Sequence, residues 1–215
     1  MPEPTPSSLD GLPESLRALA EKGEPRRYRK GAVLIHEGDF GDTLYIVLSG
    51  KVKAYSVDER DREIIYGTYG PGDWFGEMSL DGGPRSASVA MIESGSCVLI
   101  PRRMLEQHIA EHPQFAFELL SRVIARARMA TASARNMALL DVYGRVVHLL
   151  ESLAQPLPDG SRRVSERLTH GAIAARVGCS REMVSRLLKD LERGGYIEAD
   201  PDGHWLLLRR LPGHW

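Results

Sequence analysis

One short segment, residues 74–89 (WFGEMSLDGGPRSASV), gathers side chains that could hold a phosphorylated sugar. Glu77 offers a carboxylate, which can accept hydrogen bonds from a ribose hydroxyl. Arg85 offers a planar guanidinium that can bind a phosphate through two parallel hydrogen bonds, and Ser86 adds a hydroxyl beside it. Gly76 lets the backbone approach a ligand closely, and one helical turn after Glu77 would point N–H groups at an anion. An ordinary surface turn could contain some of these residues, but the whole run favours a nucleotide-binding loop.

A second segment, residues 168–191, has the pattern of two short helices around a tight turn. Thr169 and Ser180 can each cap the start of a helix by accepting a backbone N–H, and Gly178 suits the turn between them. An apolar face would pack the two helices together; its members are Ile173, Val177, Val184, Leu187, Leu188 and Leu191. The layout predicts a helix-turn-helix, although two ordinary packed helices with a charged surface would share the pattern.

The exposed face of the second helix carries side chains that suit DNA. Arg181 and Arg186 match guanine O6 and N7 in the major groove, and Glu182 can accept from the amino group of cytosine. Four other residues are placed to meet backbone phosphates, which fix the register without reading sequence. These predicted phosphate contacts are Thr169, Ser180, Ser185 and Lys189.

Short apolar runs separated by turn signals must position the first segment. The expected strands are Ala32–Ile35, Leu44–Leu48, Val52–Tyr55, Ile64–Tyr69, Ala87–Ile92 and Cys97–Ile100. Turns are expected between them, including one at Ser49-Gly50. Strands this short and evenly spaced predict an antiparallel β-roll of the jelly-roll kind. Leu12, Leu16 and Leu19 before them recur at helical spacing, which predicts a short helix lying on this domain.

From Pro113 onwards the pattern is helical. Apolar residues recur at alternating steps of four and three at Ala116, Leu120, Val123, Ala127, Ala130, Ala134 and Met137. Such a seam can pack two parallel helices of a dimer, or one helix against its own domain. The seam is interrupted at 141–145, a predicted hinge, after which a helix at Val146–Leu153 and a strand at His204–Arg210 are expected. The predicted fold class is α+β, with residues 1–20 as tail and short helix, 21–112 as β-roll, 113–140 as the long helix and 141–215 as the second domain.

Composition is that of an ordinary globular protein, with 42% hydrophobic and 27% charged residues in 215. Neither an apolar run long enough to span a membrane nor the pattern of a signal peptide is visible, so a cytoplasmic location is expected. Residues 1–110 carry 13 Lys+Arg against 17 Asp+Glu, and residues 111–215 carry 15 against 12, which favours the second half as the partner of any polyanion. The two cysteines, Cys97 and Cys179, match no disulfide framework or zinc site.

The two segments, in this order, resemble the bacterial CRP/FNR transcription-regulator family. The resemblance rests on the loop around Glu77 and Arg85, on residues 178–186 (GCSREMVSR) and on Leu140-Asp141-Val142 at the hinge, and it covers about residues 27–211. It implies a β-roll sensor, a dimerisation helix and a winged helix-turn-helix, acting as a homodimer on a palindromic operator. A half-site like TGTGA, RNA polymerase as a partner and allosteric control by a cyclic nucleotide are implied as well.

In cyclic-AMP-responsive members, a Thr-Ser pair on the dimer helix contacts the adenine; the pair corresponds here to Ala130 and Thr131. The missing hydroxyl at Ala130 forfeits one hydrogen bond, about 1 kcal/mol. The loop between Glu77 and Arg85 is also shorter than in the best-known members. Both departures favour weaker binding of cyclic AMP or a different purine nucleotide. Cyclic AMP is the expected effector because Glu77, Arg85 and Ser86 are retained, and cyclic di-GMP is the main alternative. The resemblance implies these nucleotide-binding residues: Gly76, Glu77, Met78, Arg85, Ser86 and Thr131.

Other classes of function fit the residues less well. A subunit controlling a kinase or channel would need a pseudosubstrate or membrane segment, and none is visible. The sequence shows no nucleophile–base pair that would indicate an enzyme. His108 and His112 stand four apart, as a helical metal pair would, with Glu111 between them, but no further ligand is identifiable, so no metal is expected. The cysteine cluster that iron–sulfur members need is absent from the sequence. A further alternative is a family member that binds DNA without any nucleotide.

Overall fold

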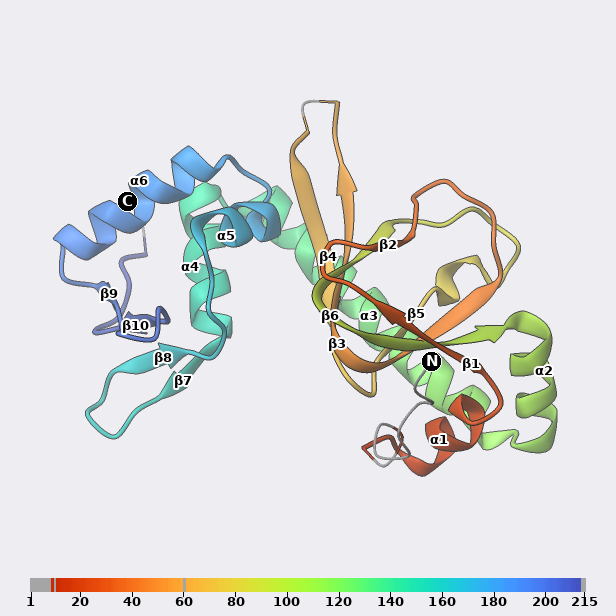
Figure 1. The fold of residues 1–215 in the computed structure, drawn as a ribbon. Helices are drawn as coiled ribbons and strands as arrows, with labels where there is room; N and C mark the ends of the chain where they lie inside the picture. Colours follow the sequence, from red (N-terminus) through yellow and green to blue (C-terminus); the bar gives the residue numbers. More distant parts are fainter. Residues whose placement is uncertain (1–8, 10, 60, 214–215) are drawn as a thin grey trace. The chain divides into compact units, whose positions relative to one another are not determined.

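The computed structural model describes residues 9, 11–59 and 61–213, and it divides into two compact units. The first comprises residues up to 56 together with 65–127, and we call it the β-roll unit. The second comprises 57–64 and 128 onwards, and we call it the helix-turn-helix unit. Residues 1–8 and 10 of the tail and short helix expected at 1–20 lie outside the described residues. Figure 1 shows the order of the elements along the chain.

The β-roll unit is built on an antiparallel sheet of six strands with the path β1-β6-β3-β4. Strand β2 pairs with β6, and β5 pairs with β3. The bounds are β1 Glu24–Tyr28, β2 Val33–Ile35, β3 Thr43–Val57, β4 Glu63–Tyr69, β5 Trp74–Phe75 and β6 Ser88–Pro101. Fully buried side chains from alternate positions of β3 and β6, such as Leu44, Ile46 and Ile100, form its core. The predicted antiparallel β-roll and the α+β class are confirmed.

The turn predicted at Ser49-Gly50 is wrong, because β3 passes through it as one long strand. The pairing of β3 with β6 shifts register around Ser49, and Gly50 takes a positive φ of 77°. A side chain at Gly50 would meet the Ser94 carbonyl oxygen at 2.7 Å, and one at Gly95 would meet the Ser49 carbonyl oxygen at 2.0 Å. Glycine therefore marks a bulge where two backbones approach closely, not the end of a strand.

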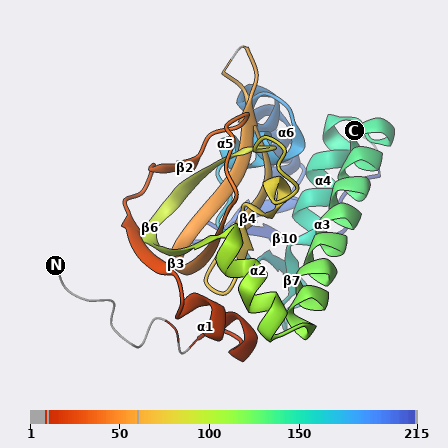
Figure 2. The same cartoon turned by 90° about the vertical axis from the view of Figure 1, so that its right-hand side faces the viewer.

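Two helices and the first part of a third complete this unit: α1 Glu14–Ala20, α2 Arg102–Glu111 and, as far as residue 127, α3 Gln114–Leu139. Leu16 and Leu19 of α1 are buried, as the leucine spacing predicted. They share a core cluster with Leu105 of α2 and Phe115 of α3. Figures 1 and 2 both show α1 and α2 side by side at one end of the roll. Helix α2 was not predicted, since its ten residues follow β6 without a turn signal.

The helix-turn-helix unit has a core shared by three helices and a small sheet. The helices are α4 Val142–Ser152, α5 His170–Val177 and α6 Arg181–Arg193. The antiparallel sheet runs β7 Ala154–Pro156, β8 Arg162–Val164, β10 Trp205–Leu207 and β9 Ile197–Ala199. The side chains of Val146, Ile173 and Leu188 meet in its core with no exposed surface. Strands β9 and β10 form the hairpin, or wing, that follows a helix-turn-helix in the winged variant.

The break between α3 and α4 is shorter than the predicted hinge at 141–145. Helix α3 ends at Leu139 and α4 begins at Val142. Asp141 caps α4 by accepting a 2.7 Å hydrogen bond from the backbone N–H of Gly144, which draws the expected hinge residues into the first turn. Arg145 donates to the carbonyl oxygens of Leu140 and Val177, each at 2.8 Å, and so ties this break to the end of α5.

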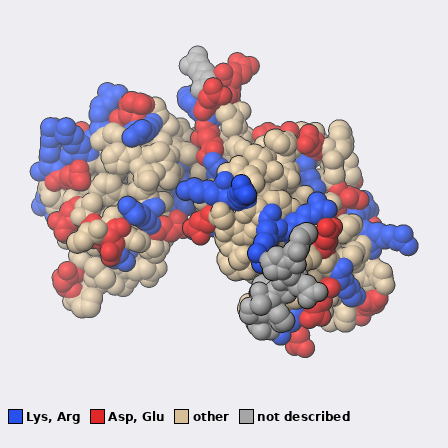
Figure 3. All heavy atoms as spheres, viewed as in Figure 1, with Lys and Arg blue, Asp and Glu red and all other residues tan. Residues whose placement is uncertain are grey.

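Charged side chains are distributed differently over the two units. On the face drawn in Figure 3, Lys and Arg gather at the end of the helix-turn-helix unit where α6 lies, whereas both signs are mixed over the β-roll unit. No helix in the described part of the chain is both long and apolar enough to cross a membrane.

Candidate functional site

Arg85 is the central cation of the loop at 74–89. It is only 7% exposed, and it donates to the carbonyl oxygens of Gly76 at 2.8 Å and Thr43 at 3.0 Å. Burial lowers the pKa of the Arg85 guanidinium, against smaller opposite effects of Tyr45, Asp42 and Glu77, but an arginine stays charged. Among the described residues, no carboxylate forms an ion pair with it. A buried cation held only by neutral carbonyls suits an anionic ligand.

The backbone around Arg85 is shaped by Gly76, which takes a φ of 92°. A side chain at this position would lie 2.7 Å from the Thr43 carbonyl oxygen and 2.9 Å from Arg85 Nη1, so only glycine fits. The predicted helical turn is present as a 3₁₀ turn, Glu77–Ser79. Ser86 is exposed next to the buried Arg85, whereas Met78 points its side chain outwards and is 58% exposed.

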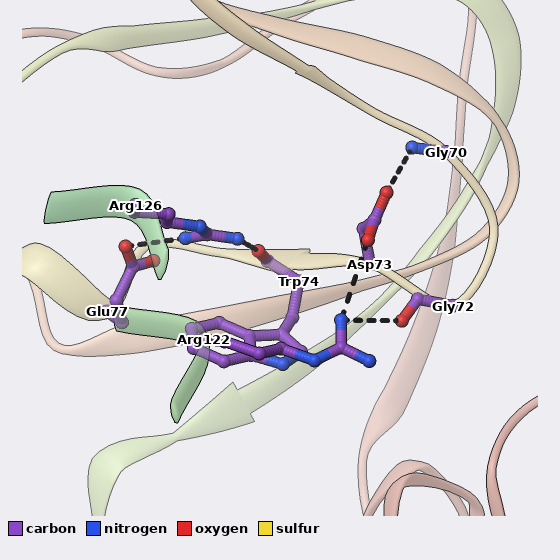
Figure 4. A network of polar contacts seen from close by, with 7 residues as sticks. All are labelled: Gly70, Gly72, Asp73, Trp74, Glu77, Arg122 and Arg126. Atoms are coloured by element: carbon purple, nitrogen blue, oxygen red, sulfur yellow. Dashed lines mark hydrogen bonds and ion pairs between the residues drawn. The ribbon is translucent and has the colours of Figure 1, made fainter. Parts of the chain in front are cut away.

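Glu77 already has a partner, Arg126 of α3, at 2.5 Å between Oε1 and Nη1. The Glu77 side chain is 7% exposed and that of Arg126 is 19% exposed. Arg126 also donates to the carbonyl oxygen of Trp74, and its guanidinium lies 4.6 Å from the Trp74 ring and 4.7 Å from the Tyr69 ring. Figure 4 shows Arg126 between the carboxylate and the tryptophan. Helix α3 is thereby held directly against the loop at residues 74–89, which we call the nucleotide loop.

A second arginine of α3 extends this contact. Arg122, one helical turn before Arg126, donates to the Gly72 carbonyl at 3.3 Å and lies 3.5 Å from the Asp73 carboxylate (Figure 4). Neither arginine was predicted as a site residue. The signal was available, since residues four apart share one face of a helix. What the sequence could not indicate is which face turns toward the loop at Trp74.

Thr131 lies on the part of α3 that belongs to the helix-turn-helix unit, and it is exposed together with Ala130. Its contribution to a nucleotide site stays a prediction. Within the described ranges, no group of three or more His, Cys, Asp or Glu is placed to hold a metal ion.

In the second candidate site, both predicted helix caps are present. Thr169 Oγ1 accepts from the N–H of Ala172 at 3.1 Å, and Ser180 Oγ accepts from the N–H of Met183 at 3.2 Å. Gly178 between the helices has a φ of 68°, which ends α5 in the left-handed conformation. The Thr169 cap uses only an oxygen lone pair, so the hydroxyl hydrogen of Thr169 stays available to a phosphate, whereas the Ser180 hydroxyl also interacts with the Glu182 carboxyl.

The predicted base readers are on the outer face of α6. Arg181, Glu182 and Arg186 are exposed, as is Lys189, while Val184 and Leu188 on the opposite face are fully buried. The nearby N–H of its own backbone and the Ser180 hydroxyl lower the pKa of the Glu182 carboxyl, so it acts as an acceptor at neutral pH. Ser185 differs from the other predicted phosphate contacts, because its hydroxyl is hydrogen-bonded to His170 Nδ1 at 2.8 Å.

A β-roll with this loop, a long helix and a winged helix-turn-helix together make up the architecture of a transcription regulator with a nucleotide-binding domain. Family models agree: the cyclic nucleotide-binding domain matches residues 25–112 and the Crp-like helix-turn-helix domain matches residues 144–212. The chain is 35% identical over 192 residues to the CRP-like cAMP-activated global transcriptional regulator of Mycobacterium tuberculosis, covering 87% of this chain and 86% of that protein. The chain belongs to the CRP/FNR family of bacterial transcription regulators, and it is not an enzyme.

Two further relatives span most of the chain. The cAMP-activated global transcriptional regulator CRP of Salmonella typhimurium is 34% identical over 180 residues, which is 80% of this chain and 84% of that protein. The solved structure of the c-di-GMP responsive global regulator CLP of Xanthomonas campestris superimposes with a TM-score of 0.78 at 26% identity, covering 91% of this chain and 99% of that one. Relatives named for two different effectors therefore share this architecture.

Proposed function

We propose that the protein is a homodimeric regulator whose binding to DNA is controlled by a cyclic nucleotide, foremost cyclic AMP. The observation that carries this proposal is Arg85, a buried guanidinium without an acidic partner among the described residues. The cyclic phosphate would supply the missing negative charge, with the Ser86 hydroxyl beside it. Glu77 would accept from the ribose 2′-hydroxyl. Relatives named as cAMP-activated at 34–35% identity support the choice of effector.

Dimerisation is supported by an exposed apolar stripe along α3. Its large exposed members are Phe117, Leu120 and Ile124, which are 73%, 53% and 43% exposed. The stripe continues through exposed Ala127, Thr131 and Ala134 at alternating steps of three and four. The predicted seam shares Leu120, Ala127 and Ala134 with this stripe. Phe117, Ile124 and Thr131 take the places of Ala116, Val123 and Ala130, because Val123 packs against the β-roll core. A second copy of α3 would cover this stripe.

Control would pass through α3, which carries Arg126 at the nucleotide loop and leads to the break at Leu140–Asp141. A nucleotide that competes for Glu77 changes the ion pair that fastens α3. It can favour one arrangement of the helix-turn-helix units only by its differential affinity for the two states. In the binding-competent state the two recognition helices would lie about 34 Å apart, one turn of DNA.

The DNA partner would be a palindromic operator with half-sites like TGTGA. Arg181, Glu182 and Arg186 would read its bases, and Thr169, Ser180 and Lys189 would hold its phosphates. RNA polymerase would be the second macromolecular partner, as the family resemblance implies. A regulator of this kind acts on the bacterial chromosome, which places it in the cytoplasm.

The test is fluorescence anisotropy of a labelled TGTGA palindrome at fixed salt, with protein alone, with cyclic AMP and with cyclic di-GMP. Tightening by cyclic AMP is expected. Arg181→Ala should reduce the preference for the palindrome over a scrambled duplex by about 1–3 kcal/mol. An unchanged ratio for Arg181→Ala would show that Arg181 does not read a base.

Cyclic di-GMP is the second candidate effector. It is favoured by the structural similarity to the c-di-GMP responsive regulator and by the missing hydroxyl at Ala130. A response to cyclic di-GMP alone would select it. Sequence-specific binding with no response to either nucleotide would instead indicate a nucleotide-independent regulator.

A further inference from the structure

The helix-turn-helix unit contains a hollow of about 570 Å³ beside the start of α5. Its lining includes the three basic side chains Arg167, His170 and Arg181, and none of the lining residues is acidic. Trp205 of β10 closes one side, held in place by a 3.0 Å hydrogen bond from its indole Nε1 to the Leu168 carbonyl. A cationic hollow of this kind suits an anion.

His170 is fixed within this hollow by two contacts. Its Nδ1 lies 2.8 Å from the Ser185 hydroxyl of α6, and its ring stacks on Trp205 with 5.9 Å between ring centres and 25° between planes. Together these contacts define both the position and the plane of the imidazole. Its other nitrogen, Nε2, has no hydrogen-bond partner among the residues that the structure describes.

The hydrogen bond between Ser185 and His170 is compatible with a hydrogen on the outer nitrogen of the ring. The Ser185 hydroxyl can donate to Nδ1, and an anion at Nε2 selects that arrangement. A neutral imidazole that accepts at Nδ1 carries its hydrogen on Nε2. If the ring takes a second proton, Nδ1 donates to Ser185 and Nε2 keeps its hydrogen. In both states His170 presents an N–H donor at Nε2.

Arg167 lines the hollow next to Gly203 of the wing. A side chain at Gly203 would lie 2.8 Å from Arg167 Nε, and Gly203 has a φ of 81°. The wing turn therefore leaves space that the exposed Arg167 occupies. Arg167 and His170 stand on either side of Leu168-Thr169, and the hydroxyl hydrogen of Thr169 is free of the cap that its oxygen makes.

We propose that this hollow holds one phosphate of the DNA backbone, with His170 Nε2 as a donor that Ser185 orients. This inference rests on the proposed DNA binding and assigns Ser185 a different part in it, as a positioning residue instead of a direct phosphate contact. Arg167 supplies the charge, and His170 supplies a directed hydrogen bond.

The experiment compares full-length variants on the TGTGA palindrome and on a scrambled duplex of the same length, by anisotropy over a range of salt concentrations. His170→Ala and Ser185→Ala should each weaken binding about 5- to 10-fold on both duplexes, because a phosphate contact carries no sequence information. The double variant should be no weaker than His170→Ala alone. His170→Gln, whose amide nitrogen can replace Nε2, and Ser185→Thr, which keeps the hydroxyl, should retain affinity. Ser165→Ala, exposed and outside the hollow, is the control.

Arg167→Gln should lower the slope of log affinity against log salt by about one, as the loss of one phosphate charge predicts. A methylphosphonate is substituted for each backbone phosphate in turn. At one position this substitution should weaken DNA binding by the wild-type protein and leave DNA binding by His170→Ala unchanged. Inorganic phosphate at equal ionic strength should not compete more than chloride; stronger competition would identify a site for free anions and overturn the proposal.

Three other outcomes would also overturn the proposal that this hollow holds a DNA phosphate. If Ser185→Ala weakens the His170→Ala protein as much as wild type, then Ser185 contacts DNA itself. Unchanged affinity of His170→Ala on both duplexes would remove His170 from the interface while the proposed function stands. Wild-type protein that binds neither duplex would refute DNA binding and this inference together.

Discussion

The carboxylate of Glu77 and the guanidinium of Arg126 join two elements that are 49 residues apart in the chain, with 2.5 Å between Oε1 and Nη1. One belongs to the nucleotide loop and the other to α3. Because the proposed ligand would use Glu77 for its ribose, nucleotide binding and the fastening of α3 involve the same oxygen atoms. The predictions below test this relationship and the features around it.

Removing either partner should destabilise the β-roll unit by leaving the other charge poorly paired. Glu77→Gln and Arg126→Met should each lower the free energy of unfolding by about 1–3 kcal/mol, and the double variant should lose less than the sum. Denaturant unfolding of the four proteins gives the coupling energy. Additive losses would mean that the two residues act independently.

Arg85 should be needed for the ligand more than for the fold. Arg85→Lys keeps a positive charge but loses the planar fork, so cyclic AMP binding measured by calorimetry should weaken by about 10- to 100-fold. Arg102→Lys, an exposed arginine elsewhere in the same unit, serves as the control. Equal affinity of the Arg85 and Arg102 variants would contradict a phosphate at Arg85.

Restoring a hydroxyl at position 130 should favour cyclic AMP. One added hydrogen bond contributes about 1 kcal/mol, so Ala130→Thr should bind cyclic AMP about fivefold more tightly. Ala138→Thr, on an exposed position of the same helix, should leave affinity unchanged. If both variants behave alike, position 130 does not face the base.

The exposed stripe of α3 should control the oligomeric state. Ile124→Glu places a charge in the proposed dimer seam, so sedimentation should report a monomer. Ala125→Glu, exposed on α3 but outside the stripe, is the matched control and should sediment as wild type. A dimer that persists in Ile124→Glu would show that another surface joins the subunits.

His108 should make the stability of the β-roll unit depend on pH. Its ring is 1% exposed and packs against Phe115 and His112. The Ser15 backbone lies near it, but neither ring nitrogen makes a hydrogen bond of normal geometry with any residue that the structure describes. Burial, with smaller contributions from His112 and Lys22, lowers the pKa of His108 below its usual 6.5. The unfolded chain therefore binds the proton first, and stability falls as pH decreases below about 6.5.

Thermal unfolding at pH 8 and pH 5.5 measures this effect. His108→Phe should show a smaller drop in melting temperature between pH 8 and pH 5.5 than wild type does. His112 is half-buried, so His112→Gln should keep most of the wild-type drop. An identical drop in wild type and His108→Phe would exclude His108 as the group responsible.

The sequence by itself determined the parts that depend on local chemistry. The caps at Thr169 and Ser180, the left-handed turn at Gly178 and the apolar face of α6 follow from residue type and spacing, and the structure contains all of them. The β-roll was predicted from the spacing of short apolar runs, and the family was recognised from its motifs. Such features are encoded within a few neighbouring residues.

The tertiary structure decided which distant groups meet. It placed Arg126 on Glu77 and His170 on Ser185, and it packed Val123 against the β-roll core so that Ile124 lies on the exposed stripe. It also carried β3 through Gly50, since a glycine that begins a turn and one that forms a bulge look alike in sequence. Helical periodicity defines a face only to within about one residue, and the packing of α3 against the roll selects the side chains on each side of it.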